Sequence, residues 1–233
     1  MSAPIVVIAN TAGGTSKTTT THALAVASAE YGKNVLAIDT DPSASLTFLL
    51  GIENPRVTIT ELLQGTANPE SAYVKSLERF TVIPSASRAF GQQGDWDWLE
   101  KIRSSFDLIL IDTQTGPSPA LRDLTARATL TVIPVTNSFA ALRGALHVMD
   151  FLDASSNSSN TSLLPVQSDG LSREFRELLP KTLTIFETAI RRDESIISAE
   201  TSMRSALSNS PQSSAASDYR EVAYSMLEMV GLF

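Results

Sequence analysis

The sequence contains no cysteine and only two histidines, His22 and His147. The lack of cysteine excludes disulfides, thiol nucleophiles and cysteine-ligated metals or iron–sulfur clusters. Zinc sites in proteins are built mainly from cysteine and histidine, so two histidines make a zinc site improbable as well. Any chemistry in this chain must therefore depend on backbone amides, hydroxyls, carboxylates and basic side chains.

Long apolar runs and an excess of basic residues are also missing. No segment approaches the roughly 18 uncharged residues of a membrane span, and no basic stretch precedes the short apolar run at the N-terminus. These absences predict a cytoplasmic protein with no membrane partner. The formal net charge of −7 argues against a generally basic nucleic-acid coat, although an acidic average is compatible with a local basic patch.

Short runs rich in valine and isoleucine recur along the chain, each followed by a polar loop and a stretch with helical spacing. The expected strands are 5–9, 35–38, 81–83, 108–111, 130–135, 162–166 and 184–186. Apolar strands of this kind are usually buried on both faces of a parallel sheet. The sequence therefore predicts an α/β fold with a central, mostly parallel, twisted sheet of about seven strands, covered by helices on both faces.

The expected helices cover the sheet between these strands. They are 18–31, 120–128, 140–152, 173–179 and 217–232, and in the last of them Val222, Leu227 and Val230 should face inward. The serine-rich run 155–162 is expected to be a solvated loop between a helix and a strand. A chain of 233 residues with 42% hydrophobic residues suits one α/β core, so we expect a single domain over 1–233.

The first expected strand leads into the segment 10–19, NTAGGTSKTT, and then into a helix, which is the context of a phosphate-binding P-loop. In such a loop, backbone N–H groups and the helix N-terminus bind the phosphates while a lysine neutralises β/γ charge. Lys17 fits that lysine, Thr18 can place its hydroxyl on Mg²⁺, and Thr19 can reach the α-phosphate. The remaining candidate phosphate-binding residues are Ala12, Gly13, Gly14, Thr15 and Ser16.

This loop departs from the usual glycine pattern, because Thr11 and Ser16 stand where glycines are common. A side chain at Ser16 crowds a tight turn and is expected to affect phosphate entry or release. Taken alone, the segment could also be an ordinary glycine turn before a helix.

Three acidic residues at predicted strand ends favour the nucleotide interpretation. Asp39 and Asp41 follow the second strand, at the sheet edge where open α/β sheets bind ligands. Asp112 ends the strand 108–111, as a Walker B acid does, and would hold Mg²⁺ directly or through water. A single acid at a strand end is more often a capping residue, but the three elements in this order predict a site for ATP and Mg²⁺.

The doubled glycine, Asp-Thr-Asp-Pro at 39–42 and Ile-Asp-Thr at 111–113 together resemble the deviant-Walker ATPases of the ParA/MinD class. The likeness extends to Thr-Val-Ile-Pro-Val at 131–135 and Phe-Glu-Thr-Ala-Ile at 186–190. The resemblance implies a nucleotide-sandwich homodimer, slow ATP hydrolysis, and non-specific binding to DNA or a membrane, with turnover stimulated by an adaptor protein. By position, Asp41 matches the family's water-orienting acid, and Asp39 resembles a residue that supports Mg²⁺ and Lys17.

Ala12 is the main departure from this family, because the signature lysine that reaches the partner's phosphates belongs there. The McdA proteins, which distribute carboxysomes over the nucleoid, also lack this lysine and are thought to supply another from the C-terminal half. Here the resemblance makes Lys181 the candidate substitute, unless it is simply a surface lysine. Arg192 resembles a family position near the base or the dimer interface and is a second candidate.

The family resemblance also implies a DNA surface on C-terminal helices, for which the candidates are Arg173, Arg176, Arg204 and Arg220; each could equally belong to a solvated helix face. The segment 221–233 contains no lysine or arginine, which disfavours a MinD-like membrane helix. The resulting hypothesis is a nucleoid-associated switch that positions or partitions a carboxysome-type or plasmid cargo with a ParB-like or McdB-like adaptor.

Two alternatives to a positioning ATPase remain open. A small-molecule kinase or synthetase, such as a relative of dethiobiotin synthetase, uses a similar fold but needs a polar substrate pocket. A non-hydrolysing ATP-binding dimerisation module is favoured by Ala12 and Ser16 and disfavoured by Asp41 and Asp112. Relatives of the nitrogenase iron protein are excluded because their cluster requires cysteines.

Overall fold

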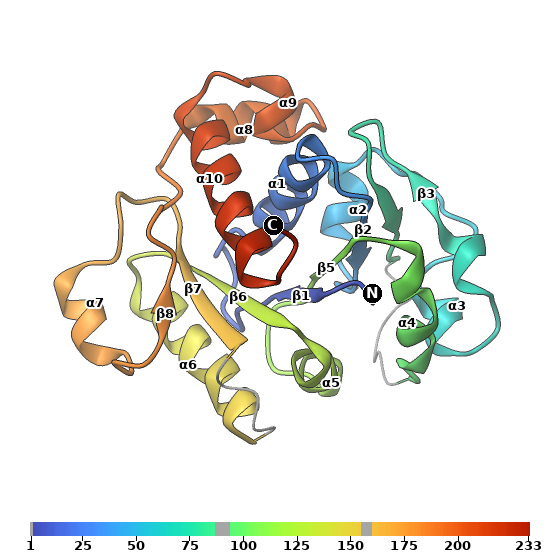
Figure 1. Cartoon of the computed structure of the whole chain (residues 1–233), viewed down its shortest axis with the longest axis horizontal. Helices are drawn as coiled ribbons and strands as arrows, with labels where there is room; N and C mark the ends of the chain where they lie inside the picture. Colours follow the sequence, from blue (N-terminus) through green and yellow to red (C-terminus); the bar gives the residue numbers. More distant parts are fainter. Residues whose placement is uncertain (1, 87–93, 155–159) are drawn as a thin grey trace.

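The computed structural model describes residues 2–86, 94–154 and 160–233, and one eight-stranded sheet runs through it (Figure 1). The strand order is β3-β4-β2-β5-β1-β6-β7-β8. The strands are β1 Ile5–Ile8, β2 Val35–Asp39, β3 Val74–Lys75, β4 Thr81–Ile83, β5 Leu108–Asp112, β6 Leu130–Val135, β7 Thr161–Pro165 and β8 Thr184–Ile185. Neighbouring strands in the described part of the chain are parallel, apart from the antiparallel pair β3 and β4.

The predicted mostly parallel α/β architecture is confirmed, but the sheet has eight strands where about seven were expected. The additional strand, β3, is two residues long and lies at the sheet edge with an exposed lysine. A segment this short has no alternation of polar and apolar residues that a sequence pattern could reveal.

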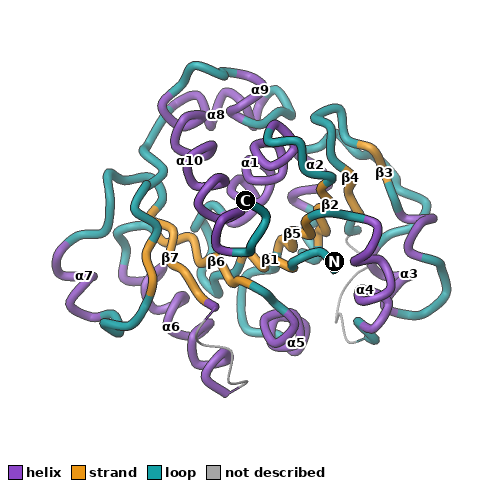
Figure 2. Tube along the Cα trace, in the orientation of Figure 1, coloured by secondary structure: helices purple, strands orange, loops and turns teal. Residues whose placement is uncertain are grey.

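Helices cover both faces of the sheet (Figure 2). On one face lie α1 Lys17–Glu30, α2 Ser45–Leu49, α8 Glu194–Thr201, α9 Ala206–Asn209 and α10 Ser214–Met229. On the other lie α3 Ile59–Leu63, α4 Asp97–Ile102, α5 Pro119–Arg127, α6 Phe139–Ala154 and α7 Arg173–Leu178. Two 3₁₀ turns, Pro69–Ala72 and Arg103–Ser105, complete the described elements.

The two apolar cores follow from the alternation of side chains along the buried central strands. In β1, Ile5 and Val7 join the core under α3 to α7, whereas Val6 and Ile8 join the core under α1 and α10. Because successive strand residues point to opposite faces, an all-apolar strand is what a sheet buried on both sides requires.

The five predicted helices correspond to α1, α5, α6, α7 and α10, with ends shifted by at most a few residues. Val222 and Leu227 are fully buried as predicted, whereas Val230 is half-buried just after α10 ends. The prediction for the serine-rich run falls mostly on 155–159, outside the described residues. Among described helices, none has the length and hydropathy to cross a membrane.

The register of the central strands sets the position of the acids. Asp39 at the end of β2 pairs in register with Asp112 at the end of β5, and Ile8 of β1 is the other register partner of Asp112. The carboxyl ends of three parallel strands therefore meet at the edge from which the loop 9–16 leaves β1.

Candidate functional site

The loop between β1 and α1 is anchored by the fully buried Asn10. Its Nδ2 donates hydrogen bonds to the carbonyl oxygens of Pro134 (2.9 Å) and Ala141 (3.1 Å), and its Oδ1 accepts from the amide of Ala12 (2.9 Å). Gly144 of α6 lies against this arrangement so closely that a Cβ there would be 2.1 Å from Asn10 Oδ1 and 2.6 Å from the Ala12 nitrogen. The absence of a side chain at Gly144 thus lets α6 hold the loop in place.

The turn into α1 uses two residues in the left-handed region, Gly14 with φ 70° and Ser16 with φ 61°. This conformation is open to glycine but costs a serine about 1 kcal/mol or more, so the departure predicted to crowd the turn does fall on a strained position. Ser16 is the N-cap of α1 but makes no side-chain cap; instead its Oγ accepts a hydrogen bond from Gln167 Nε2 at 3.0 Å. The helix N-terminus is therefore left without a side-chain acceptor, which suits an anionic ligand.

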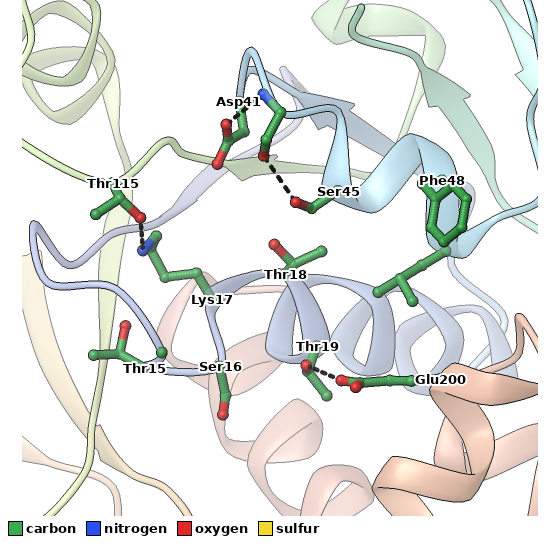
Figure 3. A pocket seen from close by; sticks show the side chains of 13 residues that line it. Thr15, Ser16, Lys17, Thr18, Thr19, Asp41, Ser45, Phe48, Thr115 and Glu200 are labelled. Atoms are coloured by element: carbon green, nitrogen blue, oxygen red, sulfur yellow. Dashed lines mark hydrogen bonds between the residues drawn. The ribbon is translucent and has the colours of Figure 1, made fainter. Parts of the chain in front are cut away.

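The ammonium group of Lys17 folds back over this loop. Its Nζ donates to the carbonyl oxygen of Ala12 (3.1 Å) and to Thr115 Oγ1 (3.3 Å), and the side chain is largely buried (Figure 3). Burial lowers the pKa of Lys17, while the neighbouring charges of Asp112 and Asp41 oppose that shift. A buried cation held only by neutral oxygens is well placed to exchange them for phosphate oxygens.

Asp112 is fully buried behind α1. Its Oδ2 accepts from Thr18 Oγ1 at 2.8 Å and its Oδ1 accepts from Thr21 Oγ1 at 3.2 Å. Burial, followed by the charge of Asp39, raises the pKa of Asp112 to about 8. The Thr18 hydroxyl therefore lies between the Asp112 carboxylate and the pocket.

Asp39 is equally buried and organises the loop that carries Asp41. It accepts hydrogen bonds from the amide and the hydroxyl of Thr47 (2.9 and 2.7 Å) and from the amide of Asp41 (3.0 Å). Burial raises the pKa of Asp39 to about 6 despite these hydrogen bonds. The side chain of Asp41 is itself oriented by the Ser43 amide, which donates to its Oδ1 at 2.8 Å.

The residues present fit Mg²⁺ held mainly by a ligand's phosphates. No group of three described His, Asp or Glu side chains could enclose a metal by itself. Mg²⁺ commonly keeps several waters and takes one or two protein ligands beside substrate phosphates. Thr18 supplies a hydroxyl at the pocket wall, and two adjacent buried carboxylates with raised pKa values lie behind it, where a divalent cation would offset their repulsion.

These groups surround an open pocket of about 490 Å³. It is lined by Gly14, Thr15, Ser16, Lys17, Thr18, Thr19, Asp41, Ser43, Ser45, Phe48, Leu49, Thr115 and Glu200. The structure thus brings Asp41 opposite the loop predicted to bind phosphate. Ala12 and Gly13 precede the lining residues in the same loop, whereas Asp39 and Asp112 lie buried behind it.

The two proposed substitute cations lie away from this pocket within one protomer. Lys181 is exposed in the turn between α7 and β8, and Arg192 is exposed just before α8; neither lines the pocket. A contribution from either to a partner's nucleotide stays a prediction.

Several pocket residues are absent from the sequence prediction. Thr115 follows the Walker B segment and could have been suspected from its proximity to Asp112, but Glu200 and Phe48 carry no motif. Glu200 is hydrogen-bonded to Thr19 from 181 positions away, and only the packing of α8 beside α1 reveals it.

The arginines predicted to bind DNA lie in three separate segments, namely α7, the turn between α8 and α9, and α10 (Figure 1). Arg173 pairs with Glu177 on α7, and Arg220 on α10 makes a two-pronged contact with Glu30 (2.7 and 3.1 Å). Arg176 and Arg204 are exposed, and neither has an ion-pair partner among the described residues. One protomer therefore does not collect all four into a single patch.

Comparisons with known proteins agree with this geometry. A family model described as an AAA domain matches residues 3–164. A ParA family protein of Chlamydia trachomatis is 30% identical, over 92% of this chain and 94% of its own. The chromosome-partitioning ATPase Soj of Thermus thermophilus is 28% identical, over 97% and 96% of the two chains.

Solved structures share the fold at lower identity. A Cyanothece McdA variant in complex with ATP has a TM-score of 0.81 and 22% identity, covering 99% of this chain and 97% of its own. Cobyrinic acid a,c-diamide synthase of Mycobacterium smegmatis has a TM-score of 0.78 and 24% identity, covering 97% and 94%. Since an ATP-bound McdA and a diamide synthase both share this fold, the fold alone does not identify the activity of this chain.

Proposed function

Because this chain belongs to the ParA/MinD class of P-loop ATPases, we propose that it is an ATP-dependent dimerising switch. In this proposal, Mg²⁺ and ATP close a homodimer around two nucleotides, and the dimer binds nucleoid DNA non-specifically. A ParB-like or McdB-like adaptor then stimulates ATP hydrolysis and releases the dimer, which positions or partitions a carboxysome-type or plasmid cargo.

The observation that carries the proposal is the arrangement of charge around the pocket. The uncapped N-terminus of α1 and the Lys17 ammonium face it from one side, and Asp41 faces it from the other. The amides and the lysine would bind the triphosphate, and Thr18, whose hydroxyl is hydrogen-bonded to Asp112, would hold Mg²⁺. Mg²⁺, when bound, supplies the charge that neutralises the phosphates.

Asp41 is the residue assigned to the attacking water. Its carboxylate lines the pocket and is oriented by the Ser43 amide, while its own amide is held by Asp39. A carboxylate so positioned can accept a hydrogen bond from water and direct an oxygen lone pair at the γ-phosphorus.

One charge is missing for efficient hydrolysis by a single protomer. Among the described residues that line the pocket, Lys17 is the only cation, whereas phosphoryl transfer is accelerated by a further cation near the transferred group. We assign that role to the partner protomer, with Lys181 as the first candidate and Arg192 as the second. Both side chains are exposed and form no ion pair within the described part of the chain. The expected consequence is slow basal turnover.

The DNA-binding step rests on the exposed arginines of the C-terminal half. Arg176 and Arg204 are available for phosphates, whereas Arg173 and Arg220 would first have to leave Glu177 and Glu30. Dimerisation doubles the number of such arginines, which raises DNA affinity steeply because each phosphate contact releases counterions.

The decisive experiment compares wild type, Asp41→Ala and a control, Glu53→Ala, which removes an exposed acid outside the pocket. Light scattering after gel filtration should show dimers with Mg²⁺ and ATP for all three. Asp41→Ala should hydrolyse ATP at least tenfold more slowly and stay on random-sequence duplex after ATP is diluted.

The alternatives give different results in the same assay. Turnover that never responds to duplex DNA, with monomers in ATP, would support a small-molecule kinase or synthetase. ATP-dependent dimers with no phosphate release in wild type would support a non-hydrolysing dimerisation module. Either result contradicts the proposed switch.

A further inference from the structure

Glu200 of α8 enters the pocket from an element outside the phosphate-binding motifs. Its Oε1 accepts a hydrogen bond from Thr19 Oγ1 at 2.8 Å, and the side chain lines the same pocket as Lys17 and Asp41. Figure 3 shows Lys17 and Thr115 at one end of the pocket, Thr18 and Thr19 nearer its middle, and Glu200 and Phe48 at the other end. The two ends therefore differ in chemistry.

This difference fixes the direction of a bound nucleotide. The terminal phosphates belong with Lys17 and the Thr18 hydroxyl, so the nucleoside must extend toward Thr19 and beyond it. At that end the pocket presents a carboxylate and the exposed phenyl ring of Phe48. A carboxylate repels phosphate oxygens but accepts hydrogen bonds from vicinal hydroxyls, as acidic residues do for ribose in other nucleotide sites.

We propose that Glu200 binds the ribose of the nucleotide through its 2′- and 3′-hydroxyl groups. The inference rests on the proposed function and deepens it, because it makes Glu200 a specificity residue for ribonucleotides at the same site. The Thr19 hydroxyl donates to this carboxylate and orients it at this end of the pocket. Phe48 and Leu49 form an apolar wall for the nucleoside on the α2 side.

Glu200 can act in this way because α8, the helix that carries it, is held in place at both ends. At its N-terminus, the Asp193 carboxylate accepts from the Ser195 amide (2.8 Å) and from the Ser214 hydroxyl of α10 (2.6 Å). Beyond its C-terminus, the amide and hydroxyl of Ser205 donate to Glu78 Oε1 (3.1 and 2.8 Å).

Glu78 also connects the C-terminal end of α8 to α1, the helix that follows the phosphate loop. Glu78 Oε2 contacts His22 of α1, and Glu78, His22 and Ser205 are all buried. These contacts hold the backbone of α8 relative to α1, and the Thr19 hydroxyl orients the exposed carboxylate of Glu200, which limits the entropy lost when it binds a ligand.

The test measures binding of three probes by calorimetry in Mg²⁺: ATP, 2′,3′-dideoxy-ATP and inorganic tripolyphosphate. The variants are Glu200→Ala and Glu200→Gln, with Glu194→Gln as a control because Glu194 is exposed on the same helix and does not line the pocket. Thermal unfolding of each variant confirms that it is folded. Wild type should bind ATP about tenfold more tightly than dideoxy-ATP, the usual size of a hydrogen bond to a charged group.

Glu200→Ala should lose that preference, binding ATP about tenfold more weakly while binding dideoxy-ATP and tripolyphosphate at least as tightly as wild type does. Glu200→Gln should be intermediate, and Glu194→Gln should match wild type.

Two results would overturn the inference alone: tighter binding of all three probes by Glu200→Ala, which identifies the carboxylate as an anion barrier, or an unchanged preference for ATP over dideoxy-ATP. If folded wild type binds neither ATP nor tripolyphosphate, the proposed function fails as well.

Discussion

Replacing Gly144 with alanine separates the effect of the phosphate loop's packing from the effect of helix propensity. Gly144 lies within α6, where alanine is favoured over glycine by about 1 kcal/mol, so propensity alone predicts a more stable protein. The structure predicts the opposite, because the new Cβ would lie 2.1 Å from Asn10 Oδ1 and 2.6 Å from the Ala12 nitrogen.

The size of the effect follows from what must move. The Ala12 nitrogen is backbone, so either α6 shifts outward or Asn10 gives up its contacts with Ala12, Pro134 and Ala141. Three hydrogen bonds at about 1 kcal/mol each exceed the gain in propensity, which leaves a net loss of about 2 kcal/mol. For a chain of this length, that loss corresponds to a Tm lower by roughly 4–8 °C.

The assay combines thermal unfolding with calorimetry of Mg²⁺ and ATP binding. Gly144→Ala should unfold earlier and bind ATP at least tenfold more weakly, because the displaced segment is the one whose carbonyl holds Lys17. The control is Ala140→Gly, the reverse change at an exposed position of the same helix, which should lose about 1 kcal/mol and keep its ATP affinity. A Gly144→Ala protein that is as stable as wild type and binds ATP normally would refute the argument.

Two further predictions concern other parts of the molecule. Burial would raise the pKa of Glu78, but the hydrogen bond and charge of His22 and the hydrogen bonds from Ser208 and Ser205 lower it to about 2. The ionised carboxylate therefore stabilises the fold above pH 4.5 by up to about 3 kcal/mol, and that contribution is lost as the pH falls toward 2. Urea unfolding should accordingly show Glu78→Gln well below wild type at pH 6 and close to it near pH 2.5, and a gap that does not change with pH would disprove the assignment. For DNA binding, Arg176→Glu and Arg204→Glu should each weaken the binding of duplex DNA by the ATP dimer and reduce its salt dependence. Arg220→Ala should mainly lower the Tm, because the guanidinium of Arg220 binds Glu30 and the Pro211 carbonyl oxygen. Equal losses of DNA binding in all three variants would refute this difference in roles.

The parts of the fold that could be predicted from sequence are those in which local pattern and tertiary role coincide. In β5, for example, the apolar run that predicts a strand is also what allows the strand to be buried along its whole length. Likewise, α1 begins directly after the glycine turn that the phosphate loop requires. That Asp39 and Asp112 share one edge of the sheet also followed from parallel strands, whereas their pairing in register depends on the strand order, which the sequence did not predict.

The parts that could not be predicted depend on contacts between distant segments. Helices α2, α3 and α9 have four or five residues each, too few for a helical period to show, and α4 and α8, with six and eight residues, were also missed although α7, with six, was predicted. The anchoring of the loop by Asn10 and Gly144 spans more than 130 positions and leaves no local signal, since an asparagine in a loop and a single glycine within a helix do not by themselves indicate a contact between them. Burial of Glu78 with His22 was equally invisible, because charged residues are expected at the surface.

Three buried ionisable groups at the pocket, Lys17, Asp39 and Asp112, have pKa values shifted against their charged forms. Burial lowers the pKa of Lys17 and raises those of Asp39 and Asp112, so each group is moved toward its neutral form. Charging these buried groups therefore costs free energy, and that cost falls when a ligand brings the opposite charge to each of them. A polyanion beside Lys17 together with a divalent cation in front of Thr18 does so for the lysine and the two carboxylates at once. A ligand with only one of these charges leaves the other side uncompensated, and for that reason the geometry favours a metal–triphosphate complex over either component alone.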